Sequence, residues 1–411
     1  MIKRKYIAGI SAALCISLFA CSSDKPGSEP VDATPTPTTE APATEAPTTE
    51  ATTEPPIKPV TINLVAIGDM LMHAGASMPG LQADGSYNYD YLFANVGDAI
   101  KTADLAVVNN EVIMGGNEIG LLGWPNFNVR TELADAEVRA GFDVVLSATN
   151  HTLDQHMSGL TNTLNYWNTN YPDIALLGVH ESAEDAAEIT IREVEGIKIA
   201  MLNYTYGLNG YSLPQGSEYA IDLMLPATRD KIMKDIAKAD SMADIVVVFP
   251  HWGVEYQFKQ NDEQSSWARA MTEAGADLII GTHPHVLQPV EWVTAENGNR
   301  SLVYYSLGNF VSIQYYNYSM LGGMADVSIT KDENGTYISS YDMEFLITHF
   351  TPGRTSVTTY YLDDYTDELA AAHAIHTDPG ENFMAVNKYY PFTVKDMKAL
   401  AEQICPDLSE Y

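Results

Sequence analysis

The sequence predicts an α/β fold built in layers, and two observations predict it. Short apolar runs rich in β-branched residues alternate with amphipathic stretches of helical spacing from about Pro59 onward. Such alternation is typical of chains whose helices cover the faces of a sheet. Hydrophobic residues make up 45% of the 411-residue chain, enough for a full core in one large domain or two modest ones.

The expected elements follow in order along residues 59–362. Short runs dominated by apolar side chains predict strands at Thr61–Ile67, Leu105–Val108, Val144–Ser147, Ile199–Leu202, Ile245–Phe249, Leu278–Ile280 and Leu302–Ser306. Apolar residues at helical spacing predict helices at Asp90–Thr102, Thr131–Ala140, Ser158–Asn170, Thr228–Ala239 and Glu263–Ala274. Strands are expected to dominate again between Gly323 and about Leu362. Residues 363–411 are expected to form an accessory helical tail.

The first 20 residues have the pattern of a signal peptide. Three basic residues at positions 3–5 precede an apolar run, Tyr6–Ala20, that is too short to span a bilayer comfortably. The run ends in Leu18-Phe19-Ala20-Cys21, which resembles a lipobox. We expect cleavage before Cys21 and lipid on its thiol, which would anchor the protein at the extracytoplasmic face of the cell membrane. Plain secretion with a coincidental cysteine is the alternative.

Residues 21–58 are expected to form a disordered stalk. The stretch Thr34–Pro56 contains almost only Thr, Pro, Glu and Ala. Such a segment cannot bury enough apolar area to offset the entropy of ordering it. Its prolines favour an extended chain, which could hold the following domain up to roughly 100 Å from the membrane.

The net charge of the chain is −32, which limits the partners it can have. A strongly acidic surface repels nucleic acid, so we expect no nucleic-acid partner. Capture of a polyanionic substrate would need a local positive feature such as a bound metal. The chain has three cysteines, and with Cys15 and Cys21 in the export segment, Cys405 is left alone. No intrachain disulfide is therefore expected.

Five of the predicted strands are each followed by side chains that bind metals. Asp69 follows the first strand, with His73 four residues later, and Glu111 follows the second. The other three strands are followed by Asn150 and His151, by His251, and by His283 and His285. Each position alone has an ordinary explanation as a turn, a helix cap or a loop. The carboxyl ends of strands share one edge in layered α/β folds, and divalent metals prefer these ligands, so together they predict a metal site.

Six blocks of sequence carry a resemblance to a known family. They are Gly68-Asp69-Met70, Asn109-Asn110-Glu111, Asn150–Asp154, His251–Tyr256, Gly281–Gln288 and Tyr305–Phe310. In order and content they resemble the CapA family of poly-γ-glutamate capsule biosynthesis proteins over roughly residues 60–315, with a weaker continuation to about 350. That family belongs to the calcineurin-like metallophosphoesterase superfamily. The resemblance therefore implies a metallophosphatase-like, four-layer α/β/β/α sandwich.

The resemblance also implies two divalent metal ions (Mn, Fe or Zn) and a role for each matching residue. The first ion would be held by Asp69 and His285, the second by Asn150, His251 and His283, and both by the bridging carboxylate of Glu111. His151 would donate a proton to the leaving group as a general acid. Asp154 would orient the His151 ring, as carboxylates often orient imidazoles.

Three departures from the superfamily pattern bear on the first metal. Leu71 stands where a histidine is usual, and His73 could replace that histidine only if the loop turns back. The bridging position holds Glu111 instead of an aspartate, which alters the metal spacing. Thr149 stands where the family more often has a second asparagine. The first metal is therefore expected to be held more weakly or to be absent.

Three further residues are candidates for the substrate or for support of the ligands. Arg130 is the best candidate for holding an anionic group of the substrate, because few cations lie near the motifs. Glu255 lies four residues after His251 and could support the ligands. Asn309 follows a predicted strand and could line the site. An ordinary surface role is the alternative for Arg130 and Glu255.

Three functions follow from these observations. The first is a cell-surface, metal-dependent hydrolase or transferase that acts on poly-γ-glutamate or another envelope polymer, with capsule-synthesis proteins as partners. The second is a non-catalytic export, anchoring or polymer-binding component of a capsule system. The third, a phosphoesterase for small molecules, rests on superfamily analogy alone. Retention of His151 and the second-metal ligands favours the first function, and the missing histidine at Leu71 favours the second.

Overall fold

A computed structural model of the chain describes residues 58–314, 316–376 and 391–406. The expected signal peptide, Cys21 and the stalk up to residue 57 lie outside the described residues, as does part of the expected C-terminal tail. Within the described ranges, no helix combines the length and the apolar character that a membrane crossing requires.

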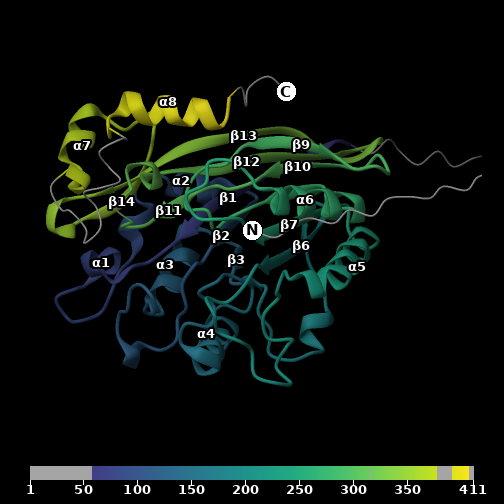
Figure 1. The fold of residues 1–411 in the computed structure, drawn as a ribbon, viewed down its shortest axis with the longest axis horizontal. Coiled ribbons are helices and arrows are strands. Elements are labelled where there is room, and N and C mark those ends of the chain that lie inside the picture. The colour runs from purple at the N-terminus through teal and green to yellow at the C-terminus, as the bar shows by residue number, and fades with distance from the viewer. Residues whose placement is uncertain (1–57, 315, 377–390, 407–411) are drawn as a thin grey trace, which may run out of the picture. The chain divides into compact units, whose positions relative to one another are not determined.

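An eight-stranded sheet contains the first strand of the fold (Figure 1). Its strands run in the order β14-β13-β12-β1-β2-β3-β4, and β11 pairs with the end of β1. The bounds are β1 Val60–Met70, β2 Leu105–Asn109, β3 Val144–Leu146, β4 Ala175–Leu177, β11 Asn309–Val311, β12 Leu321–Asp332, β13 Gly335–Phe350 and β14 Val357–Tyr361. Strands β1 to β4 are parallel, so their carboxyl ends share one edge of the sheet.

A six-stranded sheet has the order β5-β6-β7-β8-β10-β9. Its strands are β5 Thr190–Val194, β6 Ile197–Thr205, β7 Ile245–His251, β8 Leu278–Ile280, β9 Val290–Thr294 and β10 Arg300–Tyr304. Strands β6, β7, β8 and β10 are parallel, and the edge strands β5 and β9 are antiparallel to their neighbours. This sheet therefore also has one edge at which four carboxyl ends meet.

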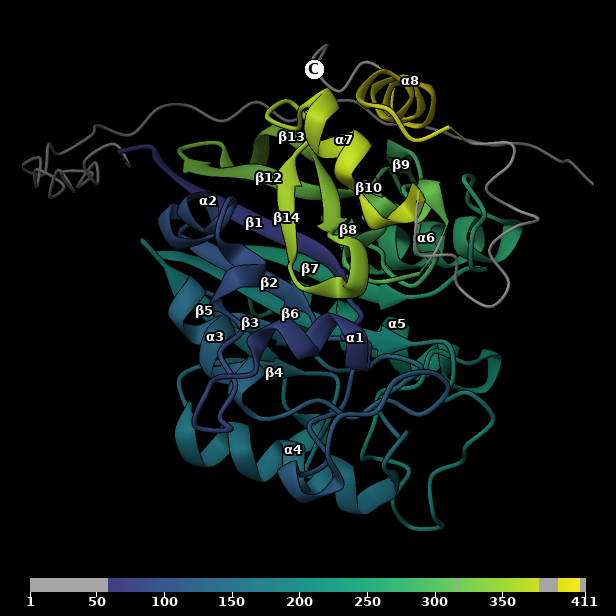
Figure 2. The ribbon, with the colours of Figure 1, turned by 90° about the vertical axis from the view of Figure 1, so that its left-hand side faces the viewer.

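Helices cover the outer faces of the two sheets (Figures 1 and 2). The helices of the described residues are α1 Ala74–Ser77, α2 Gly97–Thr102, α3 Glu132–Ala140, α4 His156–Asn170, α5 Arg229–Asp240, α6 Asp262–Ala274, α7 Asp367–Ala372 and α8 Val394–Ile404. On β7, Val246 and Val248 pack with Ile236 of α5 and Met271 of α6, whereas Val247 belongs to a larger hydrophobic cluster that contains residues of both sheets. Residues of α2 and α3 belong to that larger cluster together with β1 to β3. The expected four-layer α/β/β/α arrangement is confirmed.

The C-terminal helices pack onto the eight-stranded sheet. Helix α8 lies beside β13 in Figure 1, and its residues Met397, Ala401 and Ile404 belong to the main hydrophobic cluster. Lys398 of α8 forms an ion pair of 2.6 Å with Asp363, just beyond β14. The described part of the tail is thus held by apolar burial together with an exposed ion pair, which adds little stability by itself.

The expected central elements are present, and one expected helix is broken. In place of a single helix over Asp90–Thr102, a 3₁₀ turn at Asp90–Phe93 is followed by α2 from Gly97. Between them, Asn95 Nδ2 donates to the Thr359 carbonyl of β14 at 3.0 Å. The break therefore coincides with a long-range contact to a strand that is distant in the sequence.

Candidate metal centre

The loops that follow the parallel strands of both sheets carry the candidate ligands. Asp69 is the tenth residue of β1, and Glu111 lies two residues after the end of β2. His251 ends β7, and His283 and His285 follow β8. The backbone at Asp69 is held against the segment that contains Gly308, whose carbonyl accepts the Asp69 N–H at 2.8 Å. The two segments lie so close that a Cβ on Gly68 would collide with this carbonyl. Only glycine fits at position 68.

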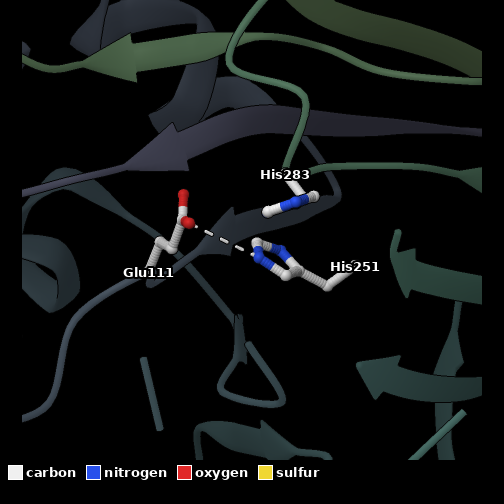
Figure 3. Close-up of side chains that lie close together, drawn as sticks. All are labelled: Glu111, His251 and His283. Carbon is white, nitrogen blue, oxygen red and sulfur yellow. Dashed lines mark ion pairs between the residues drawn. The ribbon is translucent and has the colours of Figure 1, made fainter. Parts of the chain in front are cut away.

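The first ligand group consists of Glu111, His251 and His283. Their potential ligand atoms all lie within 4.8 Å of one another, and all three side chains are buried. Figure 3 shows the three side chains pointing toward one another, with His251 Nε2 3.4 Å from Glu111 Oε1. The Asn150 amide oxygen lies 2.7 Å from the same His251 nitrogen, so Asn150 also belongs to this group.

The second ligand group consists of Asp69, Glu111 and His285. Their ligand atoms also lie within 4.8 Å of one another. His285 Nδ1 is 3.1 Å from Asp69 Oδ2 and 3.6 Å from Glu111 Oε2. Glu111 is the member common to both groups, which is the position that the resemblance gave to the bridging carboxylate.

The buried atoms of these groups fit divalent cations. Neither carboxylate oxygen of Glu111 receives an N–H or O–H from a described residue, and His283 Nδ1 has no hydrogen-bond partner among them. Buried polar atoms are rarely left in this way, and a cation would satisfy them. Carboxylate and imidazole together suit zinc and similar borderline ions.

The electrostatics of the site support the same conclusion. Burial, reinforced by the Asp69 carboxylate, raises the pKa of Glu111 well above its ordinary value. Burial lowers the pKa of His251 and of His283, so both rings are neutral and keep a lone pair for a metal. Burial alone would lower the pKa of His285, but the hydrogen bond and charge of Asp69, together with Glu255 and Asn309, outweigh burial and raise the pKa. Positive charge is thus favoured beside Asp69.

Other buried side chains orient the ligands. Asn109 Nδ2 donates to Asp69 Oδ1 at 2.9 Å, and Thr282 Oγ1 lies 2.9 Å from His251 Nδ1. Asn309 Oδ1 is 3.0 Å from His285 Nδ1, so Asn309 contacts a candidate ligand. Such outer contacts set ring orientation in metal sites. The backbone of His283 and His285 has positive φ, 97° and 57°, a strained conformation that is common at functional sites.

A cavity of about 510 Å³ opens beside the second ligand group. His151 lines it, and His151 Nδ1 is 2.7 Å from Asp154 Oδ2. The same Asp154 oxygen accepts the Phe127 N–H at 2.7 Å, and the Phe127 ring meets the His151 ring edge-on at 4.6 Å. Asp154 and Phe127 therefore fix the orientation of the His151 ring at the cavity wall.

The remaining predicted residues, His73, Glu255 and Arg130, differ in their positions relative to the cavity. His73 lines the cavity but belongs to neither ligand group, and its Nδ1 lies 3.1 Å from the Leu71 carbonyl. Burial lowers the pKa of His73 to about 4. Glu255 is exposed at the cavity wall. Arg130 does not line the cavity, because its guanidinium pairs with Glu132 at 2.8 Å and lies over the Tyr87 ring.

The sequence analysis did not identify Asn209 as part of the site. Asn209 lies in the loop after β6, has a positive φ of 49°, and contacts both Asn150 and His151 at 3.1 and 3.2 Å. The only local signal is its position in a loop between Leu208 and Gly210, since asparagine followed by glycine favours tight turns. Such a signal marks a turn and cannot assign a side chain to a site.

Two sheets enclosed by helices, with two carboxylate–histidine groups that share one glutamate at the strand ends, define a metallophosphoesterase-like fold with a candidate metal centre. Residues 63–314 match the family of bacterial capsule synthesis proteins, PGA_cap. The chain belongs to this family, and the resemblance seen in the sequence is confirmed.

Two capsule proteins and one solved structure illustrate the similarity. PGA biosynthesis protein CapA of Bacillus subtilis (strain 168) is 36% identical over 198 residues, 48% of this chain and 49% of that protein. Capsule biosynthesis protein CapA of Bacillus anthracis is 30% identical over 258 residues, 61% of this chain and 59% of that protein. The chain thus spans about half to three fifths of the length of these relatives. The calcineurin-like phosphoesterase YfkN of Bacillus subtilis is 13% identical with a TM-score of 0.37, covering 70% of this chain and 91% of that one.

Proposed function

We propose that the protein is a metal-dependent hydrolase or transferase that acts on poly-γ-glutamate or a related envelope polymer. The observation that carries the proposal is the sharing of Glu111 by two ligand groups, with the His151–Asp154 pair beside them at the wall of a cavity. Membership in a capsule synthesis family supports a capsule polymer as the substrate and capsule-synthesis proteins as partners.

Each side chain of the site has a definite task in this proposal. Asp69, Glu111 and His285 would hold one divalent cation, and Glu111, His251 and His283, with Asn150, a second. The cations would polarise the scissile group and activate water for attack. Asp154 holds His151 through Nδ1, which leaves Nε2 to donate a proton to the departing oxygen or nitrogen.

Turnover measured together with metal content tests the proposal. We expect the purified protein to bind Mn, Fe or Zn and to hydrolyse a generic phosphodiester or a γ-glutamyl polymer. Asp69→Ala should abolish turnover on every substrate, because it removes a ligand. A metal-loaded protein that cleaves neither substrate would contradict a hydrolytic role and favour the polymer-binding alternative.

We propose further that the protein is anchored at the extracytoplasmic face of the membrane through lipid on Cys21. The lipobox-like sequence Leu18–Cys21 and the Thr/Pro/Glu-rich segment after it support this proposal. Cys21→Ser should abolish labelling by a radioactive lipid precursor and move the protein out of the membrane fraction. Cys405→Ser is the matched control, and unchanged labelling of Cys21→Ser would show that the anchor is elsewhere.

A further inference from the structure

The residue that follows β6 covers part of the first ligand group. Tyr206 comes directly after Thr205, the last residue of β6, and its N–H donates to the His251 carbonyl at 3.0 Å. The centre of its ring lies 4.5 Å from that of His283 and 6.5 Å from that of His251. Tyr206 is 36% exposed, whereas the two histidines are at most 2% exposed. The Tyr206 ring therefore covers these two imidazoles on the solvent side.

The same loop also reaches the proton donor. Asn209, three residues after Tyr206, contacts Asn150 and His151 at 3.1 and 3.2 Å. The start of the loop is held by the pairing of β6 with β7 and by Thr205 Oγ1, which donates to the Gly207 carbonyl at 3.2 Å. Tyr206 is thus positioned before any substrate binds, a condition that favours a direct part in the chemistry.

The Tyr206 hydroxyl lies near two carboxylates but is bound by neither. Burial raises the pKa of Tyr206 to about 12, and the negative charges of Glu111 and Glu255 act in the same direction. Charges act strongly only at short range, so the hydroxyl is close both to the shared carboxylate and to Glu255 at the cavity wall. The hydroxyl makes no hydrogen bond to a described residue. Its O–H is available to a ligand at the metal centre.

A neutral donor at this position suits an anionic reacting group. Among the described residues that line the cavity there is no lysine or arginine, so cations at the two ligand groups would supply the attraction for a polyanion. Tyr206 adds a donor without adding charge, which is compatible with those cations and with the nearby Glu255. The cavity lies beside the second ligand group and Tyr206 over the first, so a group bound at both can contact both.

We infer that the Tyr206 hydroxyl donates a hydrogen bond to the oxygen of the scissile group that gains negative charge when water attacks. That oxygen is a non-bridging phosphoryl oxygen in a phosphoester and the carbonyl oxygen in a γ-glutamyl amide. The inference rests on the proposed function and adds a catalytic residue to it. His151 would protonate the departing atom, whereas Tyr206 keeps its own proton and stabilises the oxygen that stays.

Removal of the single hydroxyl oxygen tests the inference. Tyr206→Phe keeps a ring over His283, so metal content and melting temperature should not change. The metal-loaded full chain is compared with the wild type for kcat and KM on a generic phosphodiester, and for binding of inorganic phosphate by calorimetry. We expect kcat to fall about 10²-fold with little change in KM, because the bond strengthens as charge develops. Phosphate, which already carries that charge, should bind about tenfold more weakly.

Tyr337→Phe is the matched control. Tyr337 is also exposed, its hydroxyl donates to Asp332 at 3.0 Å near the turn between β12 and β13, and it does not line the cavity. Its replacement should leave kcat and phosphate binding at the wild-type values.

Three results would overturn the inference. They are wild-type kcat and phosphate binding in Tyr206→Phe, loss of metal from that variant, which would assign the hydroxyl to the ligands, and no saturable binding of phosphate by the metal-loaded wild type. Failure of the proposed function would be seen separately, as metal-loaded protein that hydrolyses nothing. If its phosphate affinity still depended on the Tyr206 hydroxyl, the hydrogen bond to an oxyanion would stand and only the chemical step would be lost.

Discussion

Glu111 is the residue on which the candidate metal centre depends most. It belongs to both ligand groups, it is fully buried, and its two oxygens receive no hydrogen from described residues. A buried carboxylate without a counter-charge is costly, which agrees with the raised pKa of Glu111. Cation binding would remove that cost, so Glu111 links the two ligand groups energetically as well as geometrically.

Replacement of Glu111 should therefore affect both ions. We expect Glu111→Ala to lose metal from both groups, whereas His283→Ala should lose metal from one group only, because His283 belongs to one. Elemental analysis of the purified variants gives the metal content per chain. Equal metal content in the two variants would contradict a shared role for Glu111.

His151 tests the chemistry separately from metal binding. His151→Ala should keep its metal and slow turnover by about 10²–10⁴-fold, because it removes proton transfer and not a ligand. The loss should be small for a nitrophenolate leaving group, which needs no proton, and large for alkoxide or amide leaving groups. A series of substrates with graded leaving groups measures this difference. Equal losses across the series would remove His151 from the role of general acid.

The ligand residues could be predicted because they follow strands directly, so the fold alone brings them together. Asn209 could not, since nothing in the sequence of its loop after β6 indicates that its side chain contacts Asn150 and His151. Arg130 was proposed for the substrate because few cations lie near the motifs. Its neighbour Glu132 pairs with it and keeps it away from the cavity lining, an outcome that depends on side-chain conformation.

At the scale of the elements, an aspartate stands directly before each of four parallel strands. Asp104, Asp143, Asp244 and Asp277 each stand directly before β2, β3, β7 and β8. Each carboxylate accepts a backbone N–H from the neighbouring strand, from Asn63, Ala106, Lys198 and Val246 respectively, at 2.7–2.9 Å. The aspartate thus provides an extra hydrogen bond at the amino end of each strand, opposite the edge that carries the ligands.

Two of these aspartates should respond to pH in opposite ways. Burial raises the pKa of Asp277 to about 6, despite the Val246 N–H. The folded state then binds the proton more tightly than the unfolded chain, so the stability contributed by Asp277 falls as pH rises from about 4 to about 6. Asp277→Asn keeps an oxygen for Val246 and removes the charge. It should raise the free energy of unfolding at pH 7.5 by roughly 1–3 kcal/mol, with the gain disappearing near pH 4.

Asp244 is the matched control for Asp277. Burial tends to raise its pKa, but the Lys198 N–H and the Lys331 ammonium, 2.8 Å away, outweigh burial and lower the pKa below its ordinary value. The stability that the Asp244 carboxylate contributes is present above about pH 4 and is lost at lower pH. Asp244→Asn should therefore destabilise the protein at pH 7.5, as measured by urea unfolding. Stabilisation by both substitutions would show that net charge, not local environment, decides the effect.

The central strands were predictable because buried parallel strands are short, continuous apolar runs. The expected strands Leu105–Val108, Val144–Ser147 and Ile245–Phe249 all appear, within a few residues, as β2, β3 and β7. The edge strand β5, Thr190–Val194, was not predicted. It is only partly buried and carries charged residues, so its pairing with β6 leaves no apolar run in the sequence.

At the scale of the whole molecule, each ligand group draws side chains from both sheets. Asp69 and Glu111 come from the eight-stranded sheet, and His251, His283 and His285 follow strands of the six-stranded sheet. The family resemblance predicted two sheets, but the sequence did not indicate which faces of the two sheets pack against each other. One large hydrophobic cluster contains buried side chains of both sheets, such as Ile62, Val247 and Leu278.

Removal of metal should weaken the molecule as a whole. Ions that bind only the folded state stabilise it by about 2.7 kcal/mol at a hundredfold excess over Kd. We therefore expect chelation to lower the melting temperature of the protein and added Mn or Zn to restore it. The change should vanish in Glu111→Ala. A melting temperature that chelation and added metal leave unchanged would contradict metal binding.

The position of the ligands along the chain has a consequence for the unfolded state. Asn150 and His251 are 101 residues apart, and a cation held by both would close a loop of that length. In the chain-entropy view, a permanent cross-link over about 100 residues removes roughly 4–5 kcal/mol of conformational freedom from the unfolded chain, and a cation that leaves on unfolding constrains the chain only while it is bound. Cys405 is a buried free thiol, so no disulfide closes a loop within the described residues. While bound, the metal would constrain the chain between these ligands as a disulfide does in other proteins, and chelation instead of reduction would remove the constraint.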